Sequence, residues 1–556
     1  MRPSLMWAVG DLAPGDEETL DALRHQLSSA GWQMSSPTAP PAESSSPSAL
    51  LVWTRDGLDE AAEQAVDRAR SARTPILLLG PTVTAGLSAL TEASGMSPDR
   101  WSAPHKARLR AHGTSAWQSR VAPLGEPIEI RTPILSTDKV LDSVDVLLSA
   151  HLGLRTHPVL TWNDETAVGA FCALVEADRT DEVASGARLL HLALRQILDL
   201  DPAELAPLTV GLLGFGAIGA EHARAAEALP GLQLAVICDR SPQRLAEAHE
   251  LFPGVTVTDD PDALLGDGTV DVVVVSTPPD SHADWAERVM SAGKDVIVEK
   301  PFALTVDESD AVLATAQRTG RRTVVYQNRR FDPDFLTIHS LVQAGVLGDV
   351  FHLEAFIGGF GHPCNYWHSD ESVSGGALYD WGSHLIDQIL NLHPQPIDHV
   401  TCIEHKRQWH DVTNADHTSM SIRFRDGSEA IFIHSDLAAA LKPRWYLLGT
   451  EGAITSSWRR EKVIGRSAIG TLDEDVLAAT DSPPQLTFVD PEGSTTELVQ
   501  RAPEPHAFHR QFVDDVRYGW PMTVSAEQSR RVVAVMEAAR ASARESGAPV
   551  RVDGEA

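Results

Sequence analysis

A glycine pattern in the middle of the chain constrains the fold more than any other feature. Residues 208–219, LTVGLLGFGAIG, place a short apolar run directly before Gly214-x-Gly216-x-x-Gly219. The first glycine permits a tight turn after a strand, the second lets backbone approach a pyrophosphate, and the third allows close helix packing. Asp239 follows a second apolar run, 20 residues beyond Gly219 (239 − 219). A glycine turn of another α/β protein would not explain this acid, so the segment predicts a dinucleotide-binding βαβ unit.

The helix that starts in this loop should direct unpaired N–H groups and its positive dipole end at the phosphates. The predicted cofactor contacts of the loop are Gly214, Phe215, Gly216, Ala217, Ile218 and Gly219. Asp239 should bond a free ribose 2′-hydroxyl, which favours NAD. Arg240 and the nearby Arg244 could accommodate a 2′-phosphate, so NADP stays open.

The bulk numbers describe a folded protein with several compact units. At 556 residues the chain exceeds one ordinary domain. Its hydrophobic content of 43% and charged content of 22% are typical of globular proteins. The formal charge of −31 would repel a phosphate backbone or an anionic membrane. We therefore expect neither a nucleic acid nor a membrane as a partner.

The cysteines and the N-terminus bear on location. Cys172, Cys238, Cys364 and Cys402 lack C-x-x-C spacing, so neither a disulfide framework nor a cysteine zinc site is predicted. The N-terminal apolar run is too short for a signal peptide, and no stretch approaches 18 apolar residues. A cytoplasmic location is expected.

Residues 1–200 are predicted to form an additional N-terminal α/β domain of parallel type. Strand-like runs at 49–53, 75–79 and 144–148 alternate with helix-like segments at 58–72 and 183–199. The Pro- and Ser-rich segment 36–48 is expected to be a loop, because it cannot bury enough apolar surface to order itself.

The next two predicted domains carry the motifs. Residues 206–328 show the strand–helix alternation of an α/β Rossmann domain, and 329–550 that of an α+β domain with a large, mostly antiparallel open sheet. The predicted Rossmann strands are 208–213, 232–238, 270–276, 295–298 and 322–326, with helices at 217–228, 241–250, 281–292 and 305–318. In the second domain strands are expected at 350–356, 418–424, 430–434, 445–448 and 485–489, with helices at 333–344, 383–392, 505–518 and 526–546.

Two motifs end strands at the sheet edge where a cofactor should lie. Ser276, Thr277 and Pro278 follow the apolar strand DVVVV, and His282 comes near the start of the next helix. A proline pair alone signals only a helix start, but this position predicts a wall of the cofactor site. All four residues are predicted cofactor contacts.

Glu299-Lys300-Pro301 closes the next apolar strand, DVIV. A lysine at a strand end is usually a solvated charge. This edge of the sheet should hold the nicotinamide, where an ammonium can hydrogen-bond a substrate hydroxyl and stabilise alkoxide charge. Glu299 and Lys300 are therefore expected at the cofactor, and Lys300 also at the substrate.

A third motif, GGALYDWGSHLID, spans 375–387. Asp380, His384 and Asp387 share one face if a helix begins near Asp380. A carboxylate one turn before a histidine can fix its tautomer and raise its basicity, as a general base requires. A capped helix start with a satisfied histidine is the alternative. A zinc site is less favoured for want of soft or clustered partners, and no metal is expected.

Together these motifs resemble the glucose–fructose oxidoreductase, inositol dehydrogenase and MocA (Gfo/Idh/MocA) superfamily, over residues ~206–548. The resemblance implies an NAD(P)-dependent dehydrogenase whose substrate lies against an open antiparallel sheet. It implies that Lys300, Asp380 and His384 are the catalytic residues. It also implies a homo-oligomer, a dimer or tetramer.

The implied reaction is oxidation of a secondary hydroxyl of a sugar or cyclitol, or the reverse reduction. His384 would remove the hydroxyl proton, Lys300 would hold the oxygen and Asp380 would orient the site. The predicted substrate-binding residues are Lys300, Asn328, Arg330, Trp367, Asp380 and His384, from clusters that also contain Arg329, Tyr366 and His368. Ordinary loop packing and surface charge would explain the clusters at 328–330 and 366–368 equally well.

Two other functions stay open for the same site. One is NAD-dependent glycoside cleavage, in which transient oxidation at one carbon acidifies its neighbour and allows elimination. The other is a non-catalytic sensor of nucleotide or sugar, which the intact lysine and histidine make less favoured.

Residues 1–200 show a slight resemblance to ThuA-type, glutamine-amidotransferase-like domains, in the segments LLVWTRDGLDE and THPVLTWNDET. Cys172 lies in an apolar run, which is typical of a core residue rather than a nucleophile. We expect no amidotransferase chemistry, and a binding, packing or regulatory role.

Overall fold

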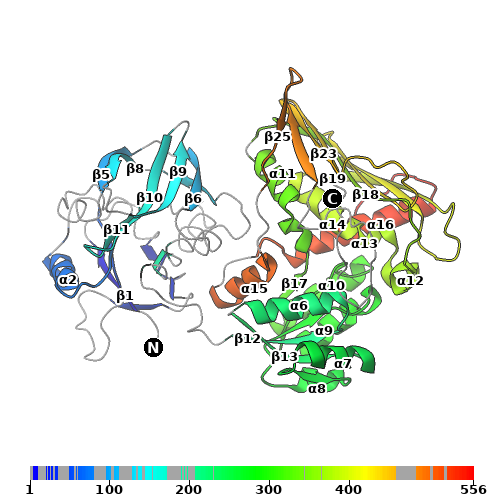
Figure 1. The fold of residues 1–556 in the computed structure, drawn as a ribbon, viewed down its shortest axis with the longest axis horizontal. Coiled ribbons are helices and arrows are strands. Elements are labelled where there is room, and N and C mark those ends of the chain that lie inside the picture. The colour runs from blue at the N-terminus through cyan, green and yellow to red at the C-terminus, as the bar shows by residue number, and fades with distance from the viewer. Residues whose placement is uncertain are drawn as a thin grey trace. The chain divides into compact units, whose positions relative to one another are not determined.

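The computed structural model divides into two compact units, residues 1–204 with 511–521 and residues 205–510 with 522–556 (Figure 1). It describes most of the second unit and segments of the first. The described ranges are 207–229, 231–343, 345–364, 366–458, 484–500, 505–518 and 522–555, together with 4–9, 32–35, 49–54, 60–79, 96–101, 105–111, 128–132, 135–140, 145–152, 155–171 and a few single residues between 20 and 197. Each unit is treated by itself.

The first unit contains a mixed sheet of nine described strands, in the order β2-β1-β3-β4-β11-β10-β9-β6-β7. The strands are β1 (Ser4–Val9), β2 (Gln33–Ser35), β3 (Ala49–Trp53), β4 (Ile76–Leu79), β6 (His105–Ala111), β7 (Ile128–Thr132), β9 (Asp145–Leu152), β10 (Arg155–Asn163) and β11 (Val168–Phe171). β5 (Met96–Trp101) and β8 (Leu135–Val140) form a separate antiparallel pair.

The prediction of a parallel sheet is correct for only part of this unit. β2, β1, β3, β4 and β11 pair in parallel, whereas β10, β9, β6 and β7 continue the sheet in antiparallel pairs. β9, β10 and β11 follow one another after short turns, and such turns can join only antiparallel neighbours. Cys172, the loop 36–48 and most of the helix predicted at 183–199 lie outside the described residues.

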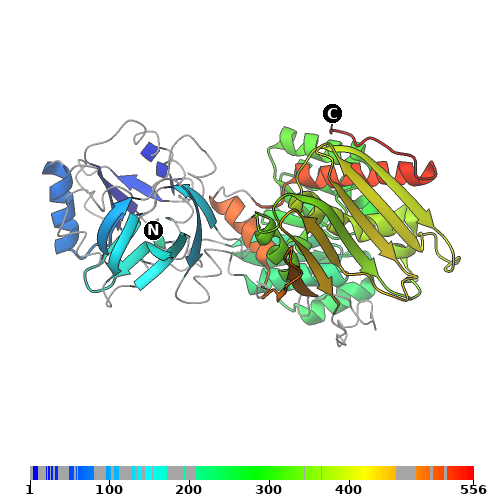
Figure 2. The same ribbon diagram turned by 90° about the horizontal axis from the view of Figure 1, so that it is seen from above.

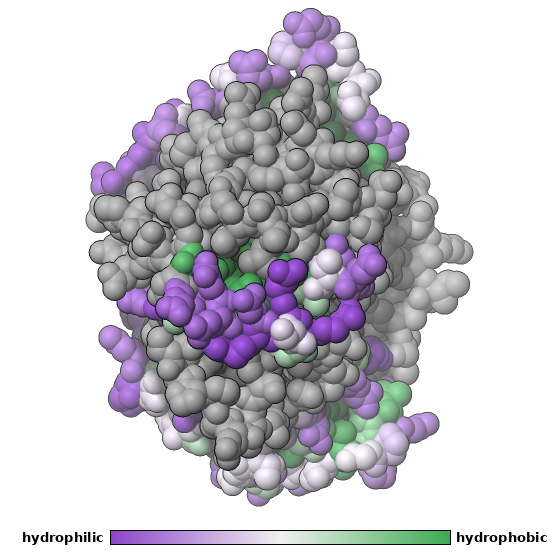
Figure 3. Space-filling view, turned by 90° about the vertical axis from the view of Figure 1, so that its left-hand side faces the viewer, coloured by the Kyte–Doolittle hydropathy of each residue, from purple (hydrophilic) through white to green (hydrophobic). Residues whose placement is uncertain are grey.

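Helix α2 (Glu60–Ser71) is amphipathic. Ala62, Ala65, Val66 and Ala69 are buried against the strands, as their spacing along a helix predicts. Its charged side chains face outward, and a band of hydrophilic residues appears on the side of the molecule drawn in Figure 3.

In the second unit, a six-stranded parallel sheet has the order β14-β13-β12-β15-β16-β17. Its strands are β12 (Leu208–Leu213), β13 (Leu232–Cys238), β14 (Thr256–Thr258), β15 (Val272–Val275), β16 (Asp295–Val298) and β17 (Thr323–Val325). The helices are α6 (Ala217–Ala228), α7 (Pro242–Leu251), α8 (Pro261–Gly266), α9 (His282–Ser291) and α10 (Val306–Thr319). The strand order reverses between β12 and β15, where doubly wound sheets bind ligands.

The second sheet of this unit has eight strands among the described residues, in the order β19-β20-β21-β18-β22-β23-β24-β25, and its described pairs are antiparallel except for β18–β21. Figure 2 looks onto its strands. They are β18 (Val350–Gly358), β19 (Ile397–His405), β20 (His417–Phe424), β21 (Glu429–Ser435), β22 (Trp445–Gly449), β23 (Gly452–Ser457), β24 (Gln485–Val489) and β25 (Thr495–Glu497). Burial alternates along β20 and β21, so one face packs and the other is open.

The helices predicted at 333–344, 383–392, 505–518 and 526–546 appear as α11 (Pro333–Gln343), α14 (Gly382–Leu392), α15 (Ala507–Tyr518) and α16 (Ala526–Arg544). The structure adds the short helices α12 (Glu371–Ser374) and α13 (Ala377–Asp380) and the 3-10 turns η4 (Asn328–Phe331) and η5 (Trp367–Ser369). A further 3-10 turn, η3 (Pro279–Ser281), lies between β15 and α9 of the parallel sheet. No helix among the described residues is long and apolar enough to cross a membrane.

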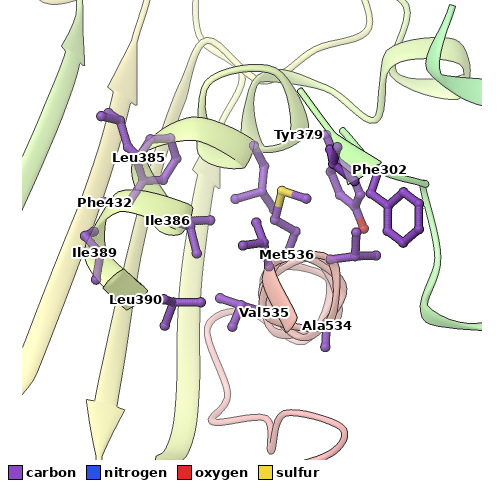
Figure 4. Close-up of a cluster of buried hydrophobic side chains, with 14 of the residues drawn as sticks. Phe302, Tyr379, Leu385, Ile386, Ile389, Leu390, Phe432, Ala534, Val535 and Met536 are labelled. Atoms are coloured by element: carbon purple, nitrogen blue, oxygen red, sulfur yellow. The ribbon is translucent and has the colours of Figure 1, made fainter. Parts of the chain in front are cut away.

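One hydrophobic core joins the parallel sheet to the open sheet. In Figure 4, Phe302, from the loop after β16, and Tyr379, from α13, lie beside Met536 of α16, while Leu385 and Phe432 meet on the other side. Because the core is continuous, it holds the loop that follows Lys300 in a fixed relation to α13. The domain boundary near 328 stays a prediction from the sequence.

Candidate active site

The glycine loop after β12 is built for close approach. Gly214 has φ +96°, and a Cβ there would lie 2.6 Å from the carbonyl oxygen of Ser276. A Cβ on Gly219 would lie 2.4 Å from the carbonyl oxygen of Gly214. Gly216 caps α6 without a side-chain hydrogen bond, so its first N–H groups stay open to a phosphate. Phe215, Ala217 and Ile218 complete the loop, which fits a dinucleotide.

Asp239 lies at the carboxyl end of β13, beside this loop. Its Oδ2 accepts the Phe215 N–H at 2.7 Å and its Oδ1 accepts the Ser241 N–H at 2.8 Å. Arg244 Nη1 lies 3.8 Å from Oδ2, and the Arg240 side chain is exposed. The carboxylate is therefore fixed where the sequence predicts the ribose contact.

The loop after β15 brings Ser276 and Thr277 to the same edge. Ser276 Oγ donates to the carbonyl of Gly214 at 2.7 Å, and Thr277 Oγ1 lies 2.8 Å from Ser281 Oγ. Pro278 precedes the turn η3. These bonds tie the predicted wall to the glycine loop.

His282 was expected to contact the cofactor, but both nitrogens of its ring are used by the protein. Its side chain is buried, with Nδ1 2.8 Å from the carbonyl oxygen of Pro301 and Nε2 2.8 Å from that of Thr277. Burial lowers the pKa of His282, although these carbonyls oppose the shift. Because both ring nitrogens face backbone, His282 joins the Thr277 loop to the loop that follows Lys300.

Lys300 and Asp380 form the centre of the candidate site. Lys300 Nζ donates to Asp380 Oδ1 at 2.7 Å and lies 3.3 Å from its carbonyl oxygen. Burial alone would raise the pKa of Asp380, but the Lys300 ammonium, with a smaller contribution from His368, lowers it to about 2. The carboxylate is therefore ionised and holds the ammonium at the end of β16.

His384 lies in the first turn of α14 and is 6% exposed. Its Nδ1 has no hydrogen-bond partner among the described residues. Burial lowers the pKa of His384 well below 6.5, and the charges of Lys300, Arg329 and Arg444 add to the shift. The imidazole is neutral, so it can accept a proton.

The expected helix face of Asp380, His384 and Asp387 is only partly correct. His384 and Asp387 both lie in α14, which begins at Gly382, whereas Asp380 is the last residue of α13. Asp380 pairs with Lys300 rather than fixing the tautomer of the histidine.

Arg330 and Asp387 are also corrected. Arg330 Nε donates to Asp387 Oδ2 at 2.7 Å and Nη2 donates to Oδ1 at 2.5 Å, both in a buried pair. Its Nη1 bonds the Thr523 carbonyl and Gln528 Oε1. The guanidinium is used inside the protein, so Arg330 is not a substrate contact.

The remaining predicted residues are Asn328, Trp367 and Glu299. Asn328 begins η4, which follows β17 after two residues, and Trp367 begins η5, where its ring stacks on His368 at 3.6 Å between centroids. Glu299 is 6% exposed, and its carboxylate bonds His222 and the Lys300 N–H. The Glu299 carboxylate therefore holds the backbone of Lys300 in the interior of the protein instead of contacting the cofactor as predicted.

Sequence reasoning missed His434, which lies near the end of β21. Burial lowers the pKa of His434 to about 4, although the Asp380 charge opposes the shift. Its Nδ1 has no hydrogen-bond partner among the described residues. His434 is 54 residues from Asp380 (434 − 380), so no local motif links the two. The only signal in the sequence is the alternation of buried and partly exposed positions along β21, which places His434 at a buried one. Within the described part of the chain, no group of side chains could hold a metal ion.

Comparison with known proteins defines the class. Residues 208–327 match "Oxidoreductase family, NAD-binding Rossmann fold", and 335–455 match "GFO/IDH/MocA C-terminal domain". The protein is an NAD-binding oxidoreductase.

Individual relatives agree with this class. The uncharacterized oxidoreductase YdgJ of Escherichia coli K12 is 33% identical over 249 residues, 44% of this chain and 70% of that protein. The scyllo-inositol 2-dehydrogenase (NADP(+)) IolW of Bacillus subtilis is 27% identical over 347 residues, 61% of this chain and 94% of that protein. A solved NAD-binding protein from Listeria innocua is 26% identical, with a TM-score of 0.53, and covers 63% of this chain and 98% of its own.

The chain belongs to the Gfo/Idh/MocA oxidoreductase family. This confirms the predicted superfamily, the NAD(P) cofactor class and the succession of a Rossmann domain and an α+β domain. The ThuA resemblance of residues 1–200 stays a prediction.

Proposed function

We propose that the protein is an NAD(P)-dependent dehydrogenase that acts on a secondary hydroxyl or ketone of a sugar, a sugar derivative or a cyclitol. The observation that carries the proposal is the 2.7 Å pair of Lys300 and Asp380 at the carboxyl end of β16, with His384 nearby. An ammonium held at this edge is suited to binding the oxygen of the reacting carbon.

The three side chains have distinct roles in this proposal. Lys300 donates to the substrate oxygen and stabilises the negative charge that develops on it. Asp380 holds the ammonium in place through the 2.7 Å ion pair. His384, a neutral imidazole, accepts the hydroxyl proton during oxidation and returns it during reduction. The bound nicotinamide supplies the hydride acceptor or donor, held by the glycine loop, Asp239 and the wall at Ser276 to Pro278.

NAD is the proposed cofactor because Asp239 presents a carboxylate at the predicted ribose position. NADP stays open because Arg240 and Arg244 are close to it. The name of IolW specifies NADP(+) and an inositol, which supports a cyclic polyol as substrate and is the reason to assay NADP as well as NAD.

Glycoside cleavage by oxidation and elimination is the second candidate. A protein of Shewanella pealeana named "Glycosyl hydrolase family 109 protein" is 34% identical over 155 residues, but these are 34% of its length. The chemistry would begin with oxidation at the same Lys300 site. A non-catalytic sensor is less favoured because the lysine and histidine are intact.

The full chain should be assayed with NAD and NADP against sugars, inositols and aryl glycosides. A dehydrogenase changes nicotinamide absorbance in step with substrate oxidation, whereas a glycosidase releases aglycone without net NADH. Lys300→Met should lower kcat/KM by about 10²-fold or more while keeping the nucleotide bound. Binding of nucleotide without turnover by the wild type would favour the sensor.

Sedimentation of the same protein tests the proposed homo-oligomer.

A further inference from the structure

A buried chain of three side chains lies behind the catalytic lysine. His222 Nε2 is 2.8 Å from Glu299 Oε1, and His222 Nδ1 is 2.8 Å from His509 Nε2. The side chains of His222 and Glu299 are 0% and 8% exposed, and His509 is 2% exposed. The three residues come from α6, the end of β16 and the start of α15, so the chain links three elements.

The direction of the hydrogen bonds follows from the chemistry of the ends. A carboxylate oxygen only accepts, so His222 Nε2 carries a proton and donates to Glu299. Burial lowers the pKa of His509 well below 6.5, and His222 and His506 add to the shift, so His509 is neutral. The bond between the two rings then has His509 Nε2–H as the donor and His222 Nδ1 as the acceptor. In this arrangement the one nitrogen of the two rings that lacks a partner, His509 Nδ1, carries no proton and leaves no buried donor unsatisfied.

The other oxygen of Glu299 reaches the lysine. Glu299 Oε2 accepts the backbone N–H of Lys300 at 3.1 Å, while the ammonium of the same residue lies 2.7 Å from Asp380. The carboxylate thus fixes the backbone from which the reacting side chain extends. A displacement of about 1 Å at such a position can cost about 10²-fold in rate.

The surroundings keep the chain in place. The ring of Tyr326 packs on His222 at 4.3 Å between centroids, and Phe508 contacts Tyr326 edge-on at 4.9 Å. Two further histidines lie near this chain: His282 of α9, which senses the charge of Glu299, and His506, whose ring lies 6.1 Å from that of His509 between centroids. His506 in turn lies near Glu221 and Arg510. None of these side chains provides a second donor to Glu299 Oε1 in the contacts described above.

We propose that His222 is a positioning residue for the reaction: by donating to Glu299 it fixes the backbone of Lys300, and His509 selects the tautomer of His222 that donates. The proposal rests on the proposed function, because it assumes that Lys300 acts on the substrate. His222, Glu299 and His509 themselves do not take part in the chemical step.

A matched pair of variants separates positioning from packing. In His222→Gln the amide nitrogen can occupy the place of Nε2 and still donate to Glu299, whereas in His222→Asn the shorter side chain can replace only Nδ1. Both lose the ring that packs on Tyr326. We expect His222→Asn to lower kcat about tenfold or more with little change in KM for the nucleotide, and His222→Gln to keep most of kcat.

Hydrogen exchange of the full chain tests the same claim without turnover. Peptides covering 295–302 report the Lys300 amide, and Pro301 contributes no amide of its own. Exchange at Lys300 should be faster in His222→Asn than in the wild type, and unchanged in His222→Gln. If the wild type turns over no substrate, the proposed function fails while exchange still decides the positioning role.

Equal kcat and equal exchange in the Gln and Asn variants would overturn the proposal. If His222→Asn does not fold, His509→Gln and His509→Ala replace the pair, because only the glutamine can still donate to His222 Nδ1. His509→Ala should then show the lower kcat and the faster Lys300 exchange, and identical behaviour of these two variants would also overturn it.

Discussion

At the scale of single residues, the site combines an ionised pair with a neutral histidine. The Lys300 ammonium lies 2.7 Å from the Asp380 carboxylate, and the low pKa of Asp380, about 2, keeps that carboxylate ionised at neutral pH. His384 is kept neutral by burial and by the nearby cations. The two features divide oxygen binding and proton transfer between different side chains.

The neutral state of His384 predicts the acid side of the pH profile. Because burial and the charges of Lys300, Arg329 and Arg444 lower its pKa well below 6.5, the base stays unprotonated as the pH falls through 6.5. In oxidation assays of the wild type, kcat/KM should therefore stay level across this pH. A fall in kcat/KM centred near 6.5 that disappears in His384→Asn would contradict this assignment.

Asp239 predicts cofactor choice at the same scale. Asp239→Ser should raise KM for NAD and lower KM for NADP, because it removes the carboxylate beside Arg240 and Arg244. The variant also weakens the bonds to the Phe215 and Ser241 N–H groups, so Asp239→Asn serves as a control that keeps the size of the side chain. An unchanged ratio of the two KM values in Asp239→Ser would place the ribose elsewhere.

At the scale of elements, a buried ion pair ties η4 to α14. Arg330 and Asp387 are 5% and 2% exposed in their side chains. Arg330→Met leaves the carboxylate buried without its partner, so we expect a loss of about 3–5 kcal/mol in the free energy of unfolding. The double variant Arg330→Met/Asp387→Leu should recover part of it. Denaturant unfolding measures both values.

The same variants test the structural role given to Arg330. If Arg330 only supports α14, the double variant should keep KM for the substrate within about threefold of the wild type. A large rise in KM without a loss of stability would restore Arg330 as a substrate contact.

Helices and strands are predicted best where the hydrophobic pattern of a segment and the turn residues that follow it indicate the same element. Strand 208–213 and helix 217–228 were predicted at their observed bounds, because an apolar run, a glycine turn and a helical pattern follow one another. The helix break at Trp381 is not predicted, because the one glycine beside it, Gly382, is by itself compatible with a continuous helix. The antiparallel strands of residues 1–200 were missed because polar, irregular runs such as β6 carry little periodicity.

The site shows the same division. Lys300 and Asp380 could be predicted to share one site because the motifs that contain them resemble those of a known family. The structure places Lys300 Nζ 2.7 Å from Asp380 Oδ1. The roles of His222 and His509 could not be predicted, because they depend on contacts between segments 77 to 287 residues apart. That of His434 could not be predicted because it depends on the burial of its side chain. Such contacts leave no local pattern in a single sequence.

At the scale of the whole molecule, buried neutral histidines link stability to pH. The pKa of His434 is lowered from 6.5 to about 4 by burial, so the unfolded chain binds a proton there at a higher pH than the folded protein does. Stability is fully present above pH 6.5 and falls as the pH drops from 6.5 to about 4. This residue alone contributes about 3 kcal/mol to that loss.

Thermal unfolding across this range gives the measurement. The melting temperature of the second unit should fall below pH 6.5, and His434→Gln should fall less steeply than the wild type. His249→Gln, at an exposed site on α7, is the control that should follow the wild type. Identical slopes for His434→Gln and the wild type would show that His434 is not held neutral.

The central claim is that hydride transfer depends on the ammonium of Lys300 held by Asp380. The most direct test is a single-turnover measurement of nicotinamide absorbance with a polyol substrate, in the wild type, Lys300→Met and Asp380→Asn, each saturated with nucleotide. The account predicts that both variants bind the nucleotide like the wild type and transfer hydride about 10²-fold more slowly or worse. Hydride transfer at the wild-type rate in Lys300→Met would contradict it.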